Sequence, residues 1–193
     1  MKPASSNSES ASASGSPSAA GPGSSPRVLY LHISPGGIPK RPIAEAIVGE
    51  NGIQGDICAH PKIHGGPRQA LLIITNEGID ELKQVGYSLY PGALGENITT
   101  QGLDRKSIRL GQRYQIGDVI VQITKLRQPC KTLNPLGEGI QSAMFDEQVK
   151  AKDPGSPRWG LGGFYASIVQ TGTIRPGDAI RFLGDAMRDP VNV

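Results

Sequence analysis

Cys130 is the residue of this chain whose type and neighbours point most directly to chemistry. It follows a strongly apolar, strand-like stretch, with Arg127 three residues before it and Lys131 directly after it. Nearby cations favour a thiolate, the form of cysteine that attacks electrophiles and binds soft metals. A free cysteine can equally serve as a small buried apolar residue. Both interpretations of Cys130 stay open on these residues alone.

A glycine-rich segment carries four residues that could bind an anion: His64, Gly65, Gly66 and Arg68. Glycines let backbone N–H groups approach an anion closely, and an arginine can bind phosphate through two parallel hydrogen bonds. The alternative is an ordinary glycine-rich turn. The densest His/Cys grouping, Cys58 with His60 and His64, does not have the spacing of a usual zinc site.

Glu96 and Asn97 lie in another glycine-containing segment, at the expected start of a strand. An asparagine side chain offers both donors and acceptors, so the pair could hydrogen-bond a heterocyclic ligand. The alternative is that Asn97 and Thr99 satisfy the backbone of their own loop. The chain has no Walker loop, no G-x-G-x-x-G opening a helix and no convincing Ser-His-Asp order, so these enzyme classes are not indicated.

Short strand-like segments separated by glycine and proline must position these residues. We expect strands over 27–33, 70–74, 113–116, 119–124, 165–170 and 179–182, with hairpins at 113–124 and 165–182. One helix is expected over 76–85, capped by Thr75 or Asn76 and stopped at Gly86, and a second, short one over 142–152. The pattern predicts a mainly β fold, a closed or nearly closed barrel with a few short helices.

The chain has 193 residues, which predicts one domain with extensions. Residues 1–26 are rich in Ser, Ala, Gly and Pro and predict a disordered tail, 27–184 the domain, and 185–193 a C-terminal tail. The tail has no apolar core of the kind that a secretory signal has. A net charge of +3 with scattered basic residues does not indicate nucleic acid binding. No apolar run approaches the length of a membrane span, so we expect a soluble, cytoplasmic protein with free thiols.

In their order along the chain, these motifs resemble the MOSC family (molybdenum-cofactor sulfurase C-terminal domain). The matching pieces include Pro39-Lys40-Arg41-Pro42, Gly52-Ile53-Gln54-Gly55-Asp56, His64-Gly65-Gly66-Pro67-Arg68, Gly95-Glu96-Asn97-Ile98-Thr99, Pro129-Cys130, Gly163-Phe164-Tyr165 and Pro176-Gly177-Asp178. The resemblance covers about residues 28–184 and implies a MOSC-type β-barrel.

The resemblance also implies a cofactor and an activity. Cys130 would be the thiolate ligand of molybdenum held on a pterin dithiolene, the molybdenum cofactor (molybdopterin), which agrees with the softness of a thiolate. His64, Gly65, Gly66 and Arg68 would lie near the cofactor phosphate or the substrate, Glu96 and Asn97 would line the pocket, and Arg127 and Lys131 would flank the ligand.

The implied reaction is reduction of a small N-hydroxylated base or amidoxime. Molybdenum would cycle between Mo(IV) and Mo(VI), and an external electron-donor protein would supply the electrons. Two other functions stay open: a sulfur carrier with a persulfide on Cys130, and a non-catalytic cofactor-binding module. Pyridoxal phosphate is not favoured, because it requires a lysine that forms a Schiff base, and no lysine in this sequence is distinguished by its context. Cys58 departs from the family pattern, in which histidine is frequent at that position.

Overall fold

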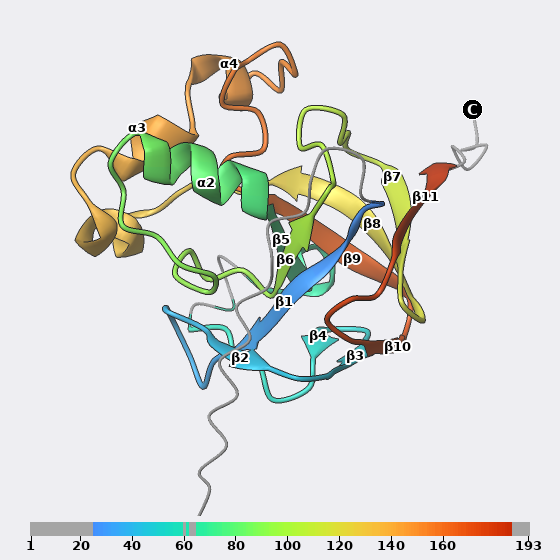
Figure 1. Cartoon of the computed structure of the whole chain (residues 1–193). Helices are drawn as coiled ribbons and strands as arrows, with labels where there is room; N and C mark the ends of the chain where they lie inside the picture. The colour runs from blue at the N-terminus through green and yellow to red at the C-terminus, as the bar shows by residue number, and fades with distance from the viewer. Residues whose placement is uncertain (1–24, 60, 62–64, 187–193) are drawn as a thin grey trace, which may run out of the picture.

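The computed structural model of the chain describes residues 25–59, 61 and 65–186. The expected tails, 1–26 and 185–193, lie almost wholly outside these residues, as does His64. The described part is mainly β, with a large mixed sheet, a small second sheet and a few short helices (Figure 1).

The large sheet has eight strands. In spatial order they are β11 (Ile180–Asp185), β7 (Gln112–Ile116), β8 (Val119–Leu126), β9 (Phe164–Gln170), β5 (Leu71–Thr75), β6 (Ile98–Gln101), β1 (Arg27–Ile33) and β2 (Arg41–Ile43). Neighbouring strands run antiparallel except β5 and β6, which are parallel. The second sheet contains β10 (Gly172–Ile174), β3 (Ala46–Gly49) and β4 (Gly52–Ile53).

Strand β5 lies between two hydrophobic clusters. Its side chains alternate: Leu71 and Ile73 join the larger cluster, and Leu72 and Ile74 join the smaller one. Because successive side chains of a strand point to opposite faces, a continuous apolar run is what a strand buried on both faces requires. The strand expected over 70–74 is therefore confirmed, shifted by one residue.

Helix α2 (Asn76–Gln84) covers the face of β5 and β6 that carries the smaller cluster (Figure 1). Of the two candidate caps, Thr75 is the one observed, and its hydroxyl accepts a hydrogen bond from Gly78 N at 3.1 Å. Ile79 and Leu82 face the cluster. Gly86 follows the helix with φ of 104°, a conformation that glycine adopts without strain.

The helix expected over 142–152 is instead two short helices, α3 (Ile140–Met144) and α4 (Glu147–Lys150). Phe145 between them is extended, and the Asp146 carboxylate begins a new helix by accepting from Val149 N at 2.8 Å. Two 3-10 helices, η1 (Pro67–Gln69) and η2 (Lys131–Leu136), complete the helical segments of the described chain.

The hairpin expected over 165–182 is wrong. Strand β9 already has β8 on one side and β5 on the other, so both of its edges are occupied. The following chain therefore pairs elsewhere: β10 joins β3, and β11 joins the free edge of β7. The hairpin of β7 and β8 is confirmed, with Ile116 opposite Val119.

The closed barrel is not confirmed. In the part of the chain that the structure describes, the edge strands of the large sheet are β11 and β2, which do not pair with each other. Among the described residues, one isolated antiparallel bridge, Arg27 with Ala179, links β1 to the segment before β11. The helices of this part of the chain include none with the length and apolar character to cross a bilayer.

Candidate functional site

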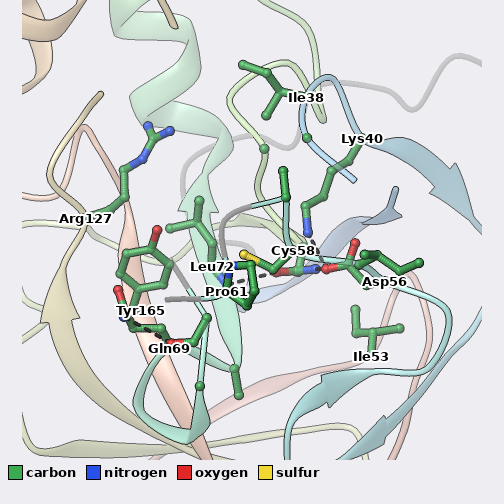
Figure 2. Close-up of a pocket in the computed structure, with 18 of the residues that line it drawn as sticks. Ile38, Lys40, Ile53, Asp56, Cys58, Pro61, Gln69, Leu72, Arg127 and Tyr165 are labelled. Atoms are coloured by element: carbon green, nitrogen blue, oxygen red, sulfur yellow. Dashed lines mark hydrogen bonds and ion pairs between the residues drawn. The ribbon is translucent and has the colours of Figure 1, made fainter. Parts of the chain in front are cut away.

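A pocket of about 360 Å³ lies where the ends of several strands and loops meet. This volume is within the usual range of small-ligand sites. Apolar side chains line part of it, and the chemically active residues that line it are Lys40, Asp56, Cys58, Asn97, Arg127, Cys130 and Tyr165. Figure 2 shows Arg127 and Tyr165 on one side, Lys40 and Asp56 on the other, and Cys58 between them.

Cys130 is placed by the end of β8 and the start of η2, where it is the residue that precedes the 3-10 helix. Its side chain is partly exposed and lines the pocket. Sγ lies 2.8 Å from the hydroxyl oxygen of Thr132, another lining residue. The thiol is therefore accessible from the cavity rather than enclosed in the core.

Arg127 is a buried cation beside this thiol. Its Nη2 donates to the carbonyl oxygen of Leu94 at 3.1 Å, whereas Nη1 has no hydrogen-bond partner among the described residues. Burial lowers the pKa of the guanidinium, and the neighbouring Tyr165 and Cys130 oppose that change. Because Nη1 is itself buried, Arg127 acts on the pocket through its positive charge rather than through a free donor.

Tyr165, on β9, faces the same side of the pocket. Burial raises the pKa of its hydroxyl, and the charge of Arg127 counteracts this. Cys58 and Cys130 both act on the hydroxyl electrostatically. The two thiols, the phenol and the guanidinium thus form one group around this part of the cavity.

Glu96 lies behind the pocket wall and is fully buried. Its Oε1 accepts from Gly92 N at 2.5 Å and from the Thr99 hydroxyl at 3.2 Å, while Oε2 has no partner among the described residues. Burial raises the pKa of the carboxyl group, and the Gly92 hydrogen bond opposes the increase. Glu96 is not among the residues that line the pocket. Its hydrogen bonds with Gly92 and Thr99 instead hold the two ends of the 92–99 segment together.

Asn97 lines the pocket, but its amide is engaged inside the protein. Oδ1 accepts from Leu72 N at 3.1 Å. Nδ2 donates to Asp56 Oδ2 at 2.8 Å and to the His32 carbonyl at 3.4 Å. Asn97 therefore holds β5, β1 and the Asp56 carboxylate together, rather than the backbone of its own loop.

The other predicted residues are divided. Gly65 and Gly66 line the pocket. Arg68 and Lys131 are exposed and are not among the lining residues. His64 lies outside the described residues. The described chain holds no group of three or more His, Cys, Asp or Glu side chains that could bind a metal ion by themselves.

Sequence reasoning assigned no role to Lys40, Asp56 or Tyr165. All three lie in motifs that carry the family resemblance, which was the available signal. The pairing of Lys40 with Asp56 joins the start of β2 to the end of β4. No spacing rule predicts such a contact, because the tertiary fold alone brings the two segments together.

A concave pocket with an accessible thiol, a buried cation and exposed backbone glycines, at the strand ends of a mixed sheet, defines a small-ligand site in a mainly β protein. The family model of the MOSC domain matches residues 60–181. The chain belongs to the MOSC family.

Three curated relatives are similar to the chain. The uncharacterized protein YflK of Bacillus subtilis (strain 168) is 29% identical over 150 residues, 76% of this chain and 63% of YflK. Protein YiiM of Escherichia coli (strain K12) is 32% identical over 94 residues, 47% of this chain and 42% of YiiM. A protein named reductase from Gibberella moniliformis is 29% identical over 93 residues, 48% of this chain and 15% of the reductase. The chain thus spans less than two thirds of the length of each relative.

A solved structure supports the same relationship. The crystal structure of YiiM from Geobacillus stearothermophilus aligns with a TM-score of 0.57 at 25% identity, covering 82% of this chain and 75% of that protein. The similarity extends beyond the residues matched by the family model and includes much of the described fold.

Proposed function

We propose that the pocket binds the molybdenum cofactor with Cys130 as the thiolate ligand, and that the protein reduces small N-hydroxylated compounds in the cytoplasm. The observation that carries the proposal is the accessible Cys130 thiol in a pocket that is also lined by the buried cation Arg127. Membership of the MOSC family supports the choice of cofactor.

The residues present fit this group. A cysteine thiolate is a soft ligand of the kind such a metal accepts. Arg127 supplies a positive charge beside the thiol, and Gly65 and Gly66 expose backbone at the rim. A Cβ at Gly65 would lie 2.9 Å from the Pro61 carbonyl oxygen, so only glycine allows this close approach.

When bound, the cofactor supplies two-electron chemistry that removes the oxygen of an N–OH group. Each turnover consumes two electrons and two protons and releases one water, and a separate electron-donor protein supplies the electrons. Cys130 holds the cofactor, Arg127 stabilises its negative charge, and the apolar lining excludes water from the substrate.

Turnover of an N-hydroxylated purine tests the proposal. The protein is purified from a host that makes the cofactor, and a reduced viologen dye serves as the electron donor. We expect two equivalents of dye to be oxidised per parent purine formed by the wild type, and no turnover by Cys130→Ser. Cys58→Ala is the matched thiol control and should retain activity. Turnover by Cys130→Ser equal to that of the wild type would contradict the proposal.

The presence of both thiols at one pocket favours a second candidate, sulfur transfer. Cys130 would carry a persulfide, and the Cys58 thiolate could attack its outer sulfur, so that the sulfur moves to Cys58 and Cys130 leaves as a thiolate. Cyanolysable sulfur in protein without molybdenum, lost in Cys130→Ser, would favour this function over the redox enzyme.

A further inference from the structure

Lys40 and Asp56 form a nearly buried ion pair in the wall of the pocket, with side chains 11% and 14% exposed. Lys40 Nζ donates to Asp56 Oδ2, and both residues line the cavity. Burying an ion pair costs more in desolvation than surface pairs do, and frequently adds little stability. The location of this pair at a ligand pocket therefore requires an explanation other than fold stability.

Asp56 is fully engaged within the protein. Its Oδ1 accepts from Ser34 N at 2.8 Å, and its Oδ2 accepts from Asn97 Nδ2 at 2.8 Å as well as from Lys40. Asn97 is itself held by Leu72 N. The carboxylate is thereby a fixed anchor, and it has little capacity left to bind a ligand.

Lys40 differs from Asp56 in this respect. An ammonium group has three N–H donors, and Asp56 is the one hydrogen-bond partner of Nζ among the described residues. Two N–H groups of the Lys40 ammonium, which Asp56 holds in place, thus remain to donate to a group inside the cavity. Because its partner holds it in place, Lys40 can donate without the full entropic cost of ordering a flexible lysine.

The backbone at Lys40 is fixed as firmly as its side chain. Lys40 N donates to the Gly92 carbonyl at 2.9 Å. Gly92 has φ of 91°, and a Cβ there would collide with the Lys40 carbonyl oxygen. A Cβ at Gly95 would lie 2.7 Å from Ile38 Cγ2. Glycines of the 92–97 segment therefore let the segment that bears Lys40 pack directly against the loop of Asn97.

We propose that Lys40, positioned by Asp56 and Asn97, is a ligand-binding residue that donates hydrogen bonds to an oxygen acceptor of the substrate. Figure 2 shows Lys40 across the pocket from Arg127 and Tyr165. Cys130 belongs to the side of Arg127, with which it interacts electrostatically. A group held at Cys130 leaves Lys40 facing the remainder of the cavity, which is where a substrate would enter. This inference rests on the proposed function and adds the residue that selects substrates.

The chemistry of the site defines the selection. The charges of Lys40 and Asp56 cancel, so Arg127 leaves these three lining residues with a net positive charge, and the pocket favours neutral or anionic ligands with an exposed oxygen. A carbonyl, an N–O oxygen or an oxyanion satisfies Lys40, whereas a cationic ligand is repelled. We expect a simple oxyanion, inorganic phosphate, to bind weakly at the same donors.

The test compares the full-length wild type with Lys40→Met and Lys40→Arg by titration calorimetry, using an N-hydroxylated purine and inorganic phosphate as probes. We expect Lys40→Met to weaken the binding of both probes at least about tenfold, as loss of a charged hydrogen bond does, and Lys40→Arg to restore part of it. Lys150→Met is the matched control, because Lys150 also pairs with a carboxylate, but on the surface with 64% exposure.

The outcomes separate the two proposals. Unchanged binding of both probes by Lys40→Met, with wild-type purine turnover intact, overturns the role of Lys40 and leaves the proposed function standing. Phosphate binding that depends on Lys40, without any purine binding, supports Lys40 and removes the proposed function. A wild type that binds neither probe overturns both. Pterin content, measured by fluorescence after oxidative release, should be unchanged in Lys40→Met; its loss would show that Lys40 binds the cofactor instead of the substrate, and would contradict the inference.

Discussion

At the scale of single residues, the pKa of the buried His32 is sensitive to the charge of Lys40. Nδ1 of this histidine is unpartnered among the described residues. Burial and, secondarily, the positive charge of Lys40 lower the pKa of His32 to about 4. The unfolded chain, with an ordinary histidine pKa near 6.5, binds a proton that the folded protein does not bind between these values.

The sign of the pH dependence follows from this difference. Stability rises with pH wherever the unfolded state binds more protons, so the contribution of His32 is complete above about pH 6.5. It is lost as pH falls toward 4, by up to about 3 kcal/mol. Urea unfolding at pH 7 and pH 4.5 should show a smaller loss for His32→Asn than for the wild type. Equal losses in the two proteins would contradict the assignment.

The single residues also show what a sequence can predict of a site. The sequence left both interpretations of Cys130 open, but because it follows a buried strand and lies near cations, Cys130 was recognisable as a site candidate. Lys40 was not, since its significance depends on Asp56, sixteen positions away across several turns. Arg68 and Arg127 were both site candidates in the sequence, yet Arg68 is exposed and Arg127 is buried at the pocket.

At the scale of elements, the glycines of the 92–97 segment determine how closely the chain at Lys40 can approach. Gly92→Ala would add a Cβ that collides with the Lys40 carbonyl and lies 3.1 Å from His32 Cδ2, at φ of 91°. We expect it to lower the free energy of unfolding by about 2 to 4 kcal/mol, the sum of backbone strain and overpacking.

Gly86→Ala is the control for Gly92→Ala. Gly86 has a similar φ of 104°, but its added Cβ would meet nothing within 4 Å. It should therefore cost only the conformational part, about 1 to 2 kcal/mol. Equal losses for the two variants in denaturant unfolding would show that the contact between Gly92 and Lys40 does not limit packing here.

Local signals predicted elements well when the element was defined by its own residues. The strands β1 and β5 were predicted on residue patterns alone, and the cap of α2 was narrowed to Thr75 or Asn76, of which Thr75 is observed. The hairpin expected over 165–182 failed because its turn residues were read without knowledge that β9 already has two neighbours. Turn chemistry predicts where a chain reverses, and the rest of the sheet decides which strand it meets.

At the scale of the whole molecule, Arg105 joins the helical layer to the loop that precedes β9. It is 3% exposed. Nε and Nη2 bind the two carboxylate oxygens of Glu81 on α2 at 3.0 and 2.6 Å. The same guanidinium donates to the carbonyls of Trp159 and Pro157. One side chain thus satisfies groups of two segments more than seventy residues apart.

Arg105→Ala should lower the free energy of unfolding by about 2 to 4 kcal/mol, because it removes a bidentate ion pair and leaves the carbonyl of buried Trp159 without this donor. Lys83→Ala removes an exposed ion pair on the same helix, with Asp80 at 3.0 Å, and should change stability by less than about 1 kcal/mol. Urea unfolding measures both. A similar small effect of both substitutions would refute the role of Arg105 as a link between the layers.

The mainly β class was predictable from the density of short strand segments, whereas closure of the sheet was not. Closure depends on whether β11 and β2 meet, and these strands lie at opposite edges of the large sheet. Neither the strands' composition nor their turns specify that distance. The pocket belongs to the same scale, since its lining comes from segments between residues 37 and 165.

The central claim, Cys130 as the ligand of a bound molybdenum cofactor, is tested most directly by molybdenum content. Elemental mass spectrometry should be run on wild type, Cys130→Ser and Cys58→Ala, all expressed in a host that makes the cofactor, with circular dichroism to verify folding. We predict near-stoichiometric molybdenum in the wild type and in Cys58→Ala, and its loss from folded Cys130→Ser. Equal molybdenum in Cys130→Ser and the wild type, or none in any of the three proteins, would contradict the account.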